Sequence, residues 1–278
     1  MTGATSARQL DTMEFEQLPL VADLPVPMGP EAPLPVMKLG GAAASKAAQA
    51  AAAGSHTAKS PAAAKVHLAL PEGAPAYWAE ACRQLMRRDR VLKRLIPQLS
   101  SQALLPRGEG EAFATLARSI VGQQISAKSA KTLWNKFARL LAEVKPELVL
   151  KLKVDDMRAA GLSARKIDYL VDLALHFTEN RLHMDEWQGM ADEAIVAELM
   201  AIRGVSRWTA EMFLIYYLMR PNVLPLDDAG LIHGISQNYF SGDPVSRSDA
   251  REVAEAWKPW CTVATWYIWR SLEAQPVA

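Results

Sequence analysis

Apolar residues recur at helical spacing from about residue 76 to the end of the chain. In the segment 111–120 they fall three and four positions apart, and the segment 164–177 repeats that spacing. A period of about 3.6 residues gives a helix one apolar face. No segment shows the sustained alternation of apolar and polar residues that a half-buried strand requires. The pattern therefore predicts an all-α fold with short connections.

Polar residues and helix breakers set the expected ends of these helices. Ser126 and Ser163 stand where N-caps belong, and Gly122 is a plausible stop. The expected helices span 77–88, 90–96, 111–120, 127–144, 154–160, 164–177, 192–200, 207–219, 227–239, 247–257 and 260–272.

The first 75 residues or so carry no core pattern. Proline is frequent up to Pro35, and the segment 40–65 is mostly alanine with Gly, Ser and Lys. This composition offers no apolar face large enough to dock on a core. We expect a disordered Ala- and Pro-rich tail over 1–75 and a helical domain over 76–278.

Composition narrows the class of protein. The 278 residues carry a formal net charge of +1, so any basic surface must be local. The two cysteines, Cys82 and Cys261, are too few for a disulfide framework or a four-cysteine zinc or iron–sulfur site. Both lie in apolar helical patterns, which predicts buried free thiols and a reducing compartment.

Targeting and metal signals are also missing from the sequence. No run approaches the roughly 20 apolar residues of a membrane span, and the N-terminus lacks a basic start followed by an apolar run. The five histidines show no metal-ligand spacing. We therefore expect an intracellular, cytoplasmic protein with no metal, no cofactor and no membrane partner.

The stretch 199–231 contains a tight turn between two predicted helices. Gly204 permits a positive φ, and Ile202 and Val205 flank it as apolar anchors. A turn at the start of a helix points backbone N–H groups outward, and these bind phosphate without side-chain charge. Arg207 can add a charged contact. On Gly204 alone, an ordinary turn with a glycine C-cap is the favoured alternative.

Two adjacent carboxylates, Asp227 and Asp228, follow that stretch at the start of the next predicted helix. One of them is expected to cap the helix. The second could stabilise cationic charge in an oxocarbenium-like transition state, or align and deprotonate a water molecule. Aromatic residues crowd the last third of the chain. Most must be core, but a few in a concave site would stack a flipped base.

Two segments taken together resemble the helix-hairpin-helix DNA glycosylase superfamily: IRGVSRWTAE at 202–211 and LPLDDAGL at 224–231. Within it, the chain is most similar to the alkylation-repair branch, DNA-3-methyladenine glycosylase II. Three further stretches occur in that family's order: SIVGQQIS at 119–126, GLSARK at 161–166 and WKPW at 257–260. The resemblance covers roughly residues 76–272.

This resemblance implies a fold of two helical lobes with a substrate cleft between them. One lobe would span 107–219 with its hairpin at 202–206, and the other would combine 76–106 with 220–278. The activity would be that of a base excision repair hydrolase. It would flip alkylated purines such as 3-methyladenine and 7-methylguanine out of double-stranded DNA and hydrolyse the N-glycosidic bond, leaving an abasic site. A monomer would suffice.

The resemblance also implies which residues form the catalytic site. Asp228 would be the catalytic carboxylate, with Asp227 its neighbour and the candidate helix cap. Trp208 matches a pocket-side aromatic, and Tyr216 and Trp269 are the other pocket candidates. Glycosylases that also cut the backbone, such as endonuclease III, place a lysine where Trp208 stands, because they need an amine for a Schiff base. A single-function, hydrolytic enzyme is therefore implied.

The DNA contacts are implied in the same way. Gly204 and Ser206 match the glycine positions of the hairpin, although Ser206 departs from the more usual glycine. Gln124 matches the side chain that fills the gap left by the flipped nucleotide. The expected DNA-binding residues are Gly204, Val205, Ser206, Arg207, Thr209, Gln124, Lys128 and Lys166. Two alternatives remain open: a glycosylase for an oxidised or deaminated base, and a helix-hairpin-helix DNA-binding module without catalysis.

Overall fold

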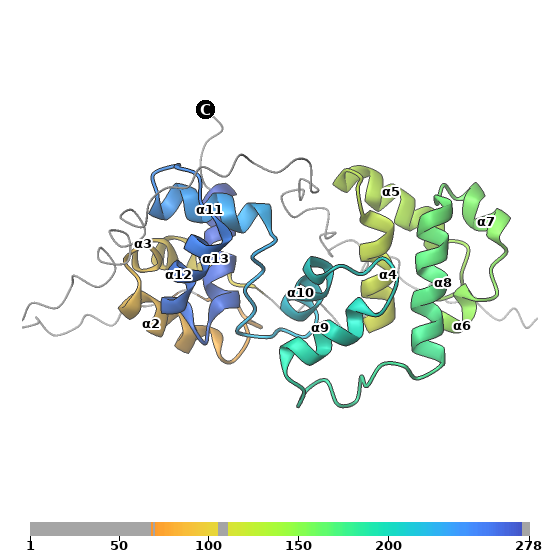
Figure 1. Ribbon diagram of the computed structural model, residues 1–278, viewed down its shortest axis with the longest axis horizontal. Helices are drawn as coiled ribbons and strands as arrows, with labels where there is room; N and C mark the ends of the chain where they lie inside the picture. The colour runs from red at the N-terminus through yellow and green to blue at the C-terminus, as the bar shows by residue number, and fades with distance from the viewer. Residues whose placement is uncertain (1–67, 69, 105–110, 274–278) are drawn as a thin grey trace, which may run out of the picture.

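The structure is a computed structural model, and it describes residues 68, 70–104 and 111–273 (Figure 1). Within these residues the chain forms twelve α-helices and two short 3₁₀-helices, and no strand. The predicted all-α fold is confirmed there. Of the tail predicted over 1–75, residues 1–67 and 69 lie outside the described part of the chain. No helix in the described ranges combines the length and the apolar character needed to cross a membrane.

One group of helices lies on the left of Figure 1 and combines the two ends of the described chain. Its members are α2 (Trp78–Arg88), α3 (Arg90–Leu99), η3 (Ser100–Gln102), α11 (Ala229–Tyr239), α12 (Arg247–Ala254), η4 (Glu255–Trp257) and α13 (Cys261–Glu273). The α13 helix is central, because it packs on α2, α3 and α11 and is buried over most of its length. Apolar faces of the other helices close around it.

The second group holds the hairpin and lies on the right of Figure 1. Its members are α4 (Ala112–Gly122), α5 (Ala127–Ala138), α6 (Pro146–Val149), α7 (Val154–Ala159), α8 (Ala164–Thr178), α9 (Asp192–Met200) and α10 (Arg207–Tyr216). The α4 helix packs against α5, α8 and α10, and α10 also packs on α9. The predicted boundaries of the two lobes, and the cleft between them, stay predictions.

Three predicted helices were too long. The one predicted over 247–257 ends at Ala254, where the 3₁₀-helix η4 follows it. The other two errors have a local cause. The helix predicted over 127–144 ends at Ala138, where the backbone passes into turns and the N–H groups of Leu140 and Leu141 bond carbonyls three residues earlier, those of Phe137 and Ala138. The helix predicted over 207–219 ends at Tyr216. Met219 there adopts a left-handed φ of +53°, which closes the helix end. The other predicted helices agree with the structure to within three residues at each end.

The predicted caps and thiols agree with the structure. Ser126 accepts a hydrogen bond from the N–H of Ser129 and Ser163 from that of Lys166, each at 3.3 Å. Cys82 and Cys261 are buried and free.

A buried carboxylate ties the α2–α3 junction to the C-terminal helices. Asp89 caps α3, since its Oδ1 accepts from the Leu92 N–H at 2.9 Å. Its Oδ2 accepts from the Tyr239 hydroxyl at 2.7 Å and from the Trp257 indole N–H at 3.1 Å. One side chain therefore satisfies donors from α3, α11 and η4.

We predict that Asp89→Ala lowers the free energy of unfolding by about 3 kcal/mol, because a helix cap is lost and two buried donors lose their acceptor. Urea denaturation followed by circular dichroism measures this loss. Asp185→Ala, at an exposed position, is the matched control and should change stability by less than about 0.5 kcal/mol. Equal losses for the two variants would contradict the prediction.

Candidate functional site

Asp228 lies buried at the start of α11, with only 3% of its surface exposed. It is the N-cap of that helix, and its Oδ1 accepts from the Leu231 N–H at 2.6 Å. The same oxygen accepts from the indole N–H of Trp269 on α13, and Oδ2 accepts from that of Trp208 on α10, both at 2.9 Å. Three N–H donors thus fix the orientation of the carboxylate, and acceptor capacity remains on Oδ2.

Aromatic rings gather beside that carboxylate. Tyr216 lies parallel to Trp269, with ring centroids 6.3 Å apart and planes at 2°. Trp266 meets both rings edge-on. Of the three predicted pocket residues, Trp208 and Trp269 therefore contact Asp228 directly, and Tyr216 packs against Trp269. Trp266 was not predicted as a pocket residue. It lies three residues before Trp269, and this spacing on one helix indicates that the two side chains are neighbours.

The assignment of Asp227 as the helix cap is wrong. The helix starts at Ala229, two residues after its expected start at 227, so Asp228 takes the extended cap conformation, with φ −83° and ψ 113°. Asp227 is exposed and forms an ion pair with Arg247 at 2.7 Å. One aspartate is thus oriented by buried donors, whereas the other faces solvent.

The turn between α9 and α10 needs a glycine for two separate reasons. Gly204 has a φ of +87°, which side-chain-bearing residues rarely adopt. A Cβ at this position would also overlap the ring of Tyr169 on α8. The adjoining residue Arg203 is held by Asp172. The Asp172 carboxylate accepts hydrogen bonds from the Arg203 backbone N–H at 2.8 Å and from the Arg203 Nε at 3.0 Å. The turn is therefore a rigid part of the fold.

Backbone groups of this turn are available to a ligand. Within the described residues, the N–H groups of Gly204 and Ser206 have no hydrogen-bond partner. Ser206 caps α10 by accepting from the Thr209 N–H at 3.2 Å, and its side chain also bonds the Thr209 hydroxyl at 3.1 Å. The side chains of Val205 and Thr209 are buried. The turn can therefore bind an anion through the backbone N–H groups of Gly204 and Ser206, next to the N-terminus of α10, and not through the side chains of Val205 and Thr209.

The segment between α4 and α5 is fastened to the turn. The Gln123 side chain donates to the Gly204 carbonyl at 2.8 Å. The next residue, Gln124, is exposed and has a left-handed φ of +61°. This conformation is uncommon for a residue other than glycine, asparagine or aspartate, so the surrounding contacts enforce it. Gln123 was not predicted as a site residue, and the pair of glutamines alone gave no reason to separate the two.

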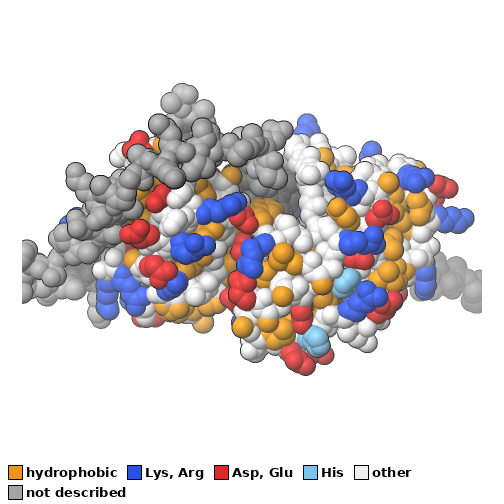
Figure 2. Space-filling model, in the orientation of Figure 1, with side chains coloured by type: hydrophobic (Ala, Val, Ile, Leu, Met, Phe, Trp, Pro, Cys, Tyr) orange, Lys and Arg blue, Asp and Glu red, His pale blue; other side chains and the backbone are white. Residues whose placement is uncertain are grey.

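The basic residues predicted to bind DNA are not equally free. Arg207 forms two hydrogen bonds with Glu193, at 3.0 and 2.7 Å, and lies 3.6 Å from Glu211. Lys166 donates to the Val121 carbonyl at 2.6 Å. Lys128, near the start of α5, is exposed and forms no ion pair within the described ranges. Figure 2 shows acidic and basic side chains interspersed on one face of the molecule, in keeping with its small net charge.

The decisive comparison is with protein families. Residues 117–260 match the family model described as the HhH-GPD superfamily base excision DNA repair protein. This segment includes α5, the turn, Asp228 and its Trp208 donor. The chain belongs to the HhH-GPD superfamily.

Several HhH-GPD proteins are similar along most of the helical part. A putative DNA-3-methyladenine glycosylase of Bacillus subtilis is 32% identical over 169 residues, which cover 58% of this chain and 59% of that relative. A DNA-3-methyladenine glycosidase from Bacillus halodurans has a structure with a TM-score of 0.65 and 30% identity, over 70% of this chain and 89% of that one. The Schizosaccharomyces pombe 3-methyladenine DNA glycosylase Mag1, solved in complex with abasic DNA, gives a TM-score of 0.63 and 28% identity, over 72% and 99%. This chain thus spans about three fifths of the length of the first relative.

The HhH-GPD domain also buries a carboxyl group that the sequence did not single out. Glu211 lies on α10, four residues after Arg207, and is 7% exposed. Its Oε2 is buried and has no hydrogen-bond partner. Burial raises the pKa of Glu211 to about 7, although Arg207 acts in the opposite direction. Since burial depends on the tertiary fold, this pKa shift could not be predicted from the amino-acid pattern.

We predict that Glu211 makes stability depend on pH. Its folded pKa of about 7 exceeds the ordinary value of 4.5, so the native state binds the extra proton between these values. The stabilising contribution is therefore complete below about pH 4.5 and is lost as pH rises through about 7. Glu211→Gln cannot ionise, so its stability relative to wild type should increase by up to about 3 kcal/mol between about pH 5 and pH 8. Urea denaturation of both proteins at the two pH values measures the change. A difference independent of pH would contradict the prediction.

Proposed function

We propose that this HhH-GPD protein is a monofunctional DNA glycosylase of the DNA-3-methyladenine glycosylase II type. It would hydrolyse the N-glycosidic bond of alkylated purines in double-stranded DNA and leave an abasic site. The observation that carries the proposal is the Asp228 carboxylate, buried and oriented by Trp208, Trp269 and the Leu231 N–H. The relatives named as 3-methyladenine glycosylases support the same activity. All these site residues come from one chain, so a monomer suffices.

The chemistry follows from the charge that develops as the bond breaks. Departure of the base leaves an oxocarbenium-like sugar, and an adjacent carboxylate stabilises that positive charge. Asp228 can do this through Oδ2, which holds one hydrogen bond where Oδ1 holds two. Because its orientation is fixed in advance, the carboxylate need not reorganise during the reaction. Water then completes the hydrolysis, and an acceptor position on Oδ2 can align it.

Alkylated purines suit the surroundings of this carboxylate. A base such as 3-methyladenine or 7-methylguanine carries positive charge and is a good leaving group, so little acid catalysis is needed. Aromatic faces attract such a cation and stack on its ring. Tyr216 and Trp269 supply parallel rings next to Asp228. Selectivity would come from this stacking and from the charge of the base.

Double-stranded DNA would be held beside the turn. The N–H groups of Gly204 and Ser206, which have no partner among the described residues, lie just before α10 and can bind a phosphate. Gln124, exposed on the segment that Gln123 ties to Gly204, would enter the gap left by the flipped nucleotide. The fission yeast neighbour was solved with abasic DNA, the kind of product this reaction would leave.

A non-catalytic DNA-binding module fits the site less well. A carboxylate beside the DNA repels phosphate, so the negative charge of Asp228 gives no advantage to a protein that only binds, and a neutral Asn or Ser could cap α11 as well. An oxidised or deaminated base is the other alternative, and it lacks the positive charge that the aromatic rings favour.

We predict that Asp228→Asn slows base release by a hundredfold or more, because the charge that stabilises the transition state is removed. Single-turnover release of 7-methylguanine from duplex DNA measures the rate, and DNA binding should persist. Asp227→Asn, which changes only the partner of Arg247, is the matched control and should react at nearly the wild-type rate. Equal rates for Asp228→Asn and wild type would refute the role of Asp228. No release of any damaged base by wild type would favour the binding module.

We also predict that borohydride traps no covalent complex between the protein and its DNA. Trapping reduces a Schiff base, which requires an amine, and Trp208 occupies the position where backbone-cutting relatives carry lysine. Gel electrophoresis of the reduced reaction detects any adduct, with a lysine-bearing glycosylase as the positive control. An adduct formed during base release would show that another amine attacks the sugar.

A further inference from the structure

The exposed face of α5 is basic along its whole length. Four of its residues are cations: Lys128, Lys131, Lys136 and Arg139 at the C-cap. At about 100° per residue these four fall within an arc of about 140°. All four are exposed, whereas Ala130 and Phe137 on the opposite face are fully buried. No Asp or Glu interrupts the segment from 127 to 139. We call this surface the α5 track.

These four cations are also unpaired. None of them forms an ion pair in the part of the chain that the structure describes. Cations near the turn differ in this respect: Arg203 pairs with Asp172, and Arg207 pairs with Glu193. If the protein binds duplex DNA, the turn supplies amides but few free charges. The free charges lie next to it, on α5.

The α5 track starts at the predicted DNA contacts. Its helix is capped by Ser126, two residues after Gln124, and the Gln123 side chain binds the Gly204 carbonyl. Lys128 therefore lies within one helical turn of the segment that touches the hairpin. The N-terminal end of the track is thus continuous with the proposed DNA-binding surface.

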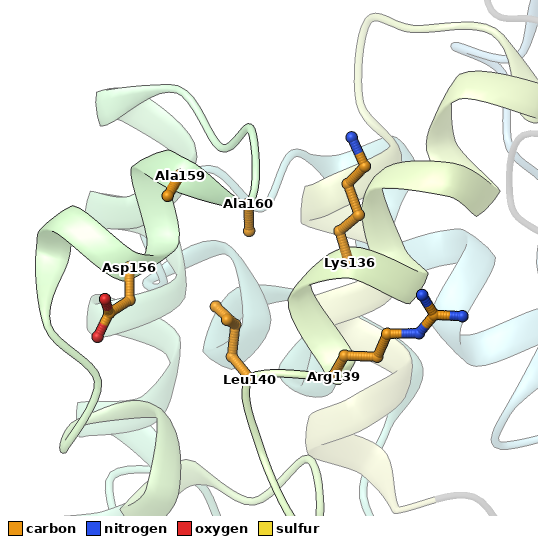
Figure 3. Close-up of a pocket in the computed structure, with 6 residues that line it drawn as sticks. All are labelled: Lys136, Arg139, Leu140, Asp156, Ala159 and Ala160. Atoms are coloured by element: carbon orange, nitrogen blue, oxygen red, sulfur yellow. The ribbon is translucent and has the colours of Figure 1, made fainter.

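The far end of the α5 track lines a hollow between α5 and α7. The hollow holds about 350 Å³ and is open to solvent. Its lining residues are Lys136, Arg139, Leu140, Asp156, Ala159 and Ala160. Figure 3 shows the two cations on one wall and Asp156 on the other, with its carboxylate directed away from them. Positive charge is therefore left uncompensated at this end too.

The length of the track matches a stretch of duplex. From Lys128 to Arg139 the helix rises about 16 Å at 1.5 Å per residue. Duplex DNA rises 3.4 Å per base pair, so that distance corresponds to about five base pairs. A row of cations that long spans several phosphates of one strand.

We propose that the α5 track binds the phosphate backbone of duplex DNA flanking the damaged base, extending the interface from the hairpin to the hollow at Lys136 and Arg139. This inference rests on the proposed function, because it takes the hairpin as the centre of the DNA interface. The contact is independent of sequence, as phosphate contacts are. It supplies electrostatic affinity for DNA that Arg203 and Arg207 at the hairpin do not supply, because both are paired with carboxylates.

Two exposed cations in the other group of helices provide a control. Arg87 on α2 and Lys93 on α3 are exposed cations outside every ion pair among the described residues. They belong to the other group of helices and have no contact with the hairpin. Removing Arg87 and Lys93 lowers the net charge by the same two units as removing Lys136 and Arg139. A difference between the two double variants therefore reports position and not total charge.

The test compares Lys136→Gln/Arg139→Gln with Arg87→Gln/Lys93→Gln and wild type. Affinity for an undamaged duplex of about 25 base pairs is measured by fluorescence anisotropy over a range of salt concentrations. Each lost phosphate contact reduces the slope of log affinity against log salt by about 0.9. We expect the α5 variant to lose up to about 1.8 from that slope and to bind tenfold or more weakly near 0.1 M salt. The control variant should keep the wild-type slope. Thermal unfolding confirms that both variants fold.

Three outcomes would overturn the proposal: an unchanged slope for the α5 variant, equal losses for both variants, or a loss confined to the control variant. Equal losses would mean general electrostatic attraction, and a loss confined to the control would assign DNA to the α2–α3 surface. An undamaged duplex makes this test separate from base release. If no damaged base is released, the proposed function fails while the slopes remain readable. If release occurs and the slopes match, only the α5 track fails.

Discussion

The hydrogen bonds to Asp228 connect the two groups of helices at a single carboxylate. Its partners come from α10 in one group and from α11 and α13 in the other. The carboxylate also caps α11, so the position of that helix and the direction of the oxygen atoms have one cause. The geometry of the proposed catalytic carboxylate and the packing of the helices are therefore not separable at this residue. A change that displaces Trp208 or Trp269 alters both.

At the turn between α9 and α10, the capacity to bind an anion rests more on backbone conformation than on side-chain charge. Gly204 supplies the dihedral angle, Gln123 fixes the neighbouring segment, and the nearby arginines are paired with acids. Such a turn offers an anion a set of fixed dipoles and little net charge. If the protein binds DNA as proposed, the turn would position the phosphate backbone while other residues neutralise its charge, which would allow a chain of net charge +1 to bind a polyanion.

The sequence predicted those features that depend on local patterns. Helices followed from apolar periodicity, whereas the site residues were implied by the resemblance to a glycosylase family, and their roles stay proposals. The errors concern the ends of helices: α5 stops at Ala138 where turns begin, and Asp228 caps α11 in place of Asp227. Burial of Glu211 was invisible because it results from the contacts of α10 with other helices. Apolar periodicity indicates which face of a helix is apolar, but it does not indicate which polar atom becomes buried in the folded protein.

The close approach of Gly204 to Tyr169 has a genetic consequence. Two independent constraints act at position 204, one steric and one torsional. A second mutation that shrinks Tyr169 would make room for a Cβ, yet it would leave the backbone at φ +87°, where a larger residue remains strained. Selection for revertants of a Gly204 substitution should therefore recover glycine itself and not suppressors on α8. The position has no compensating partner in the fold.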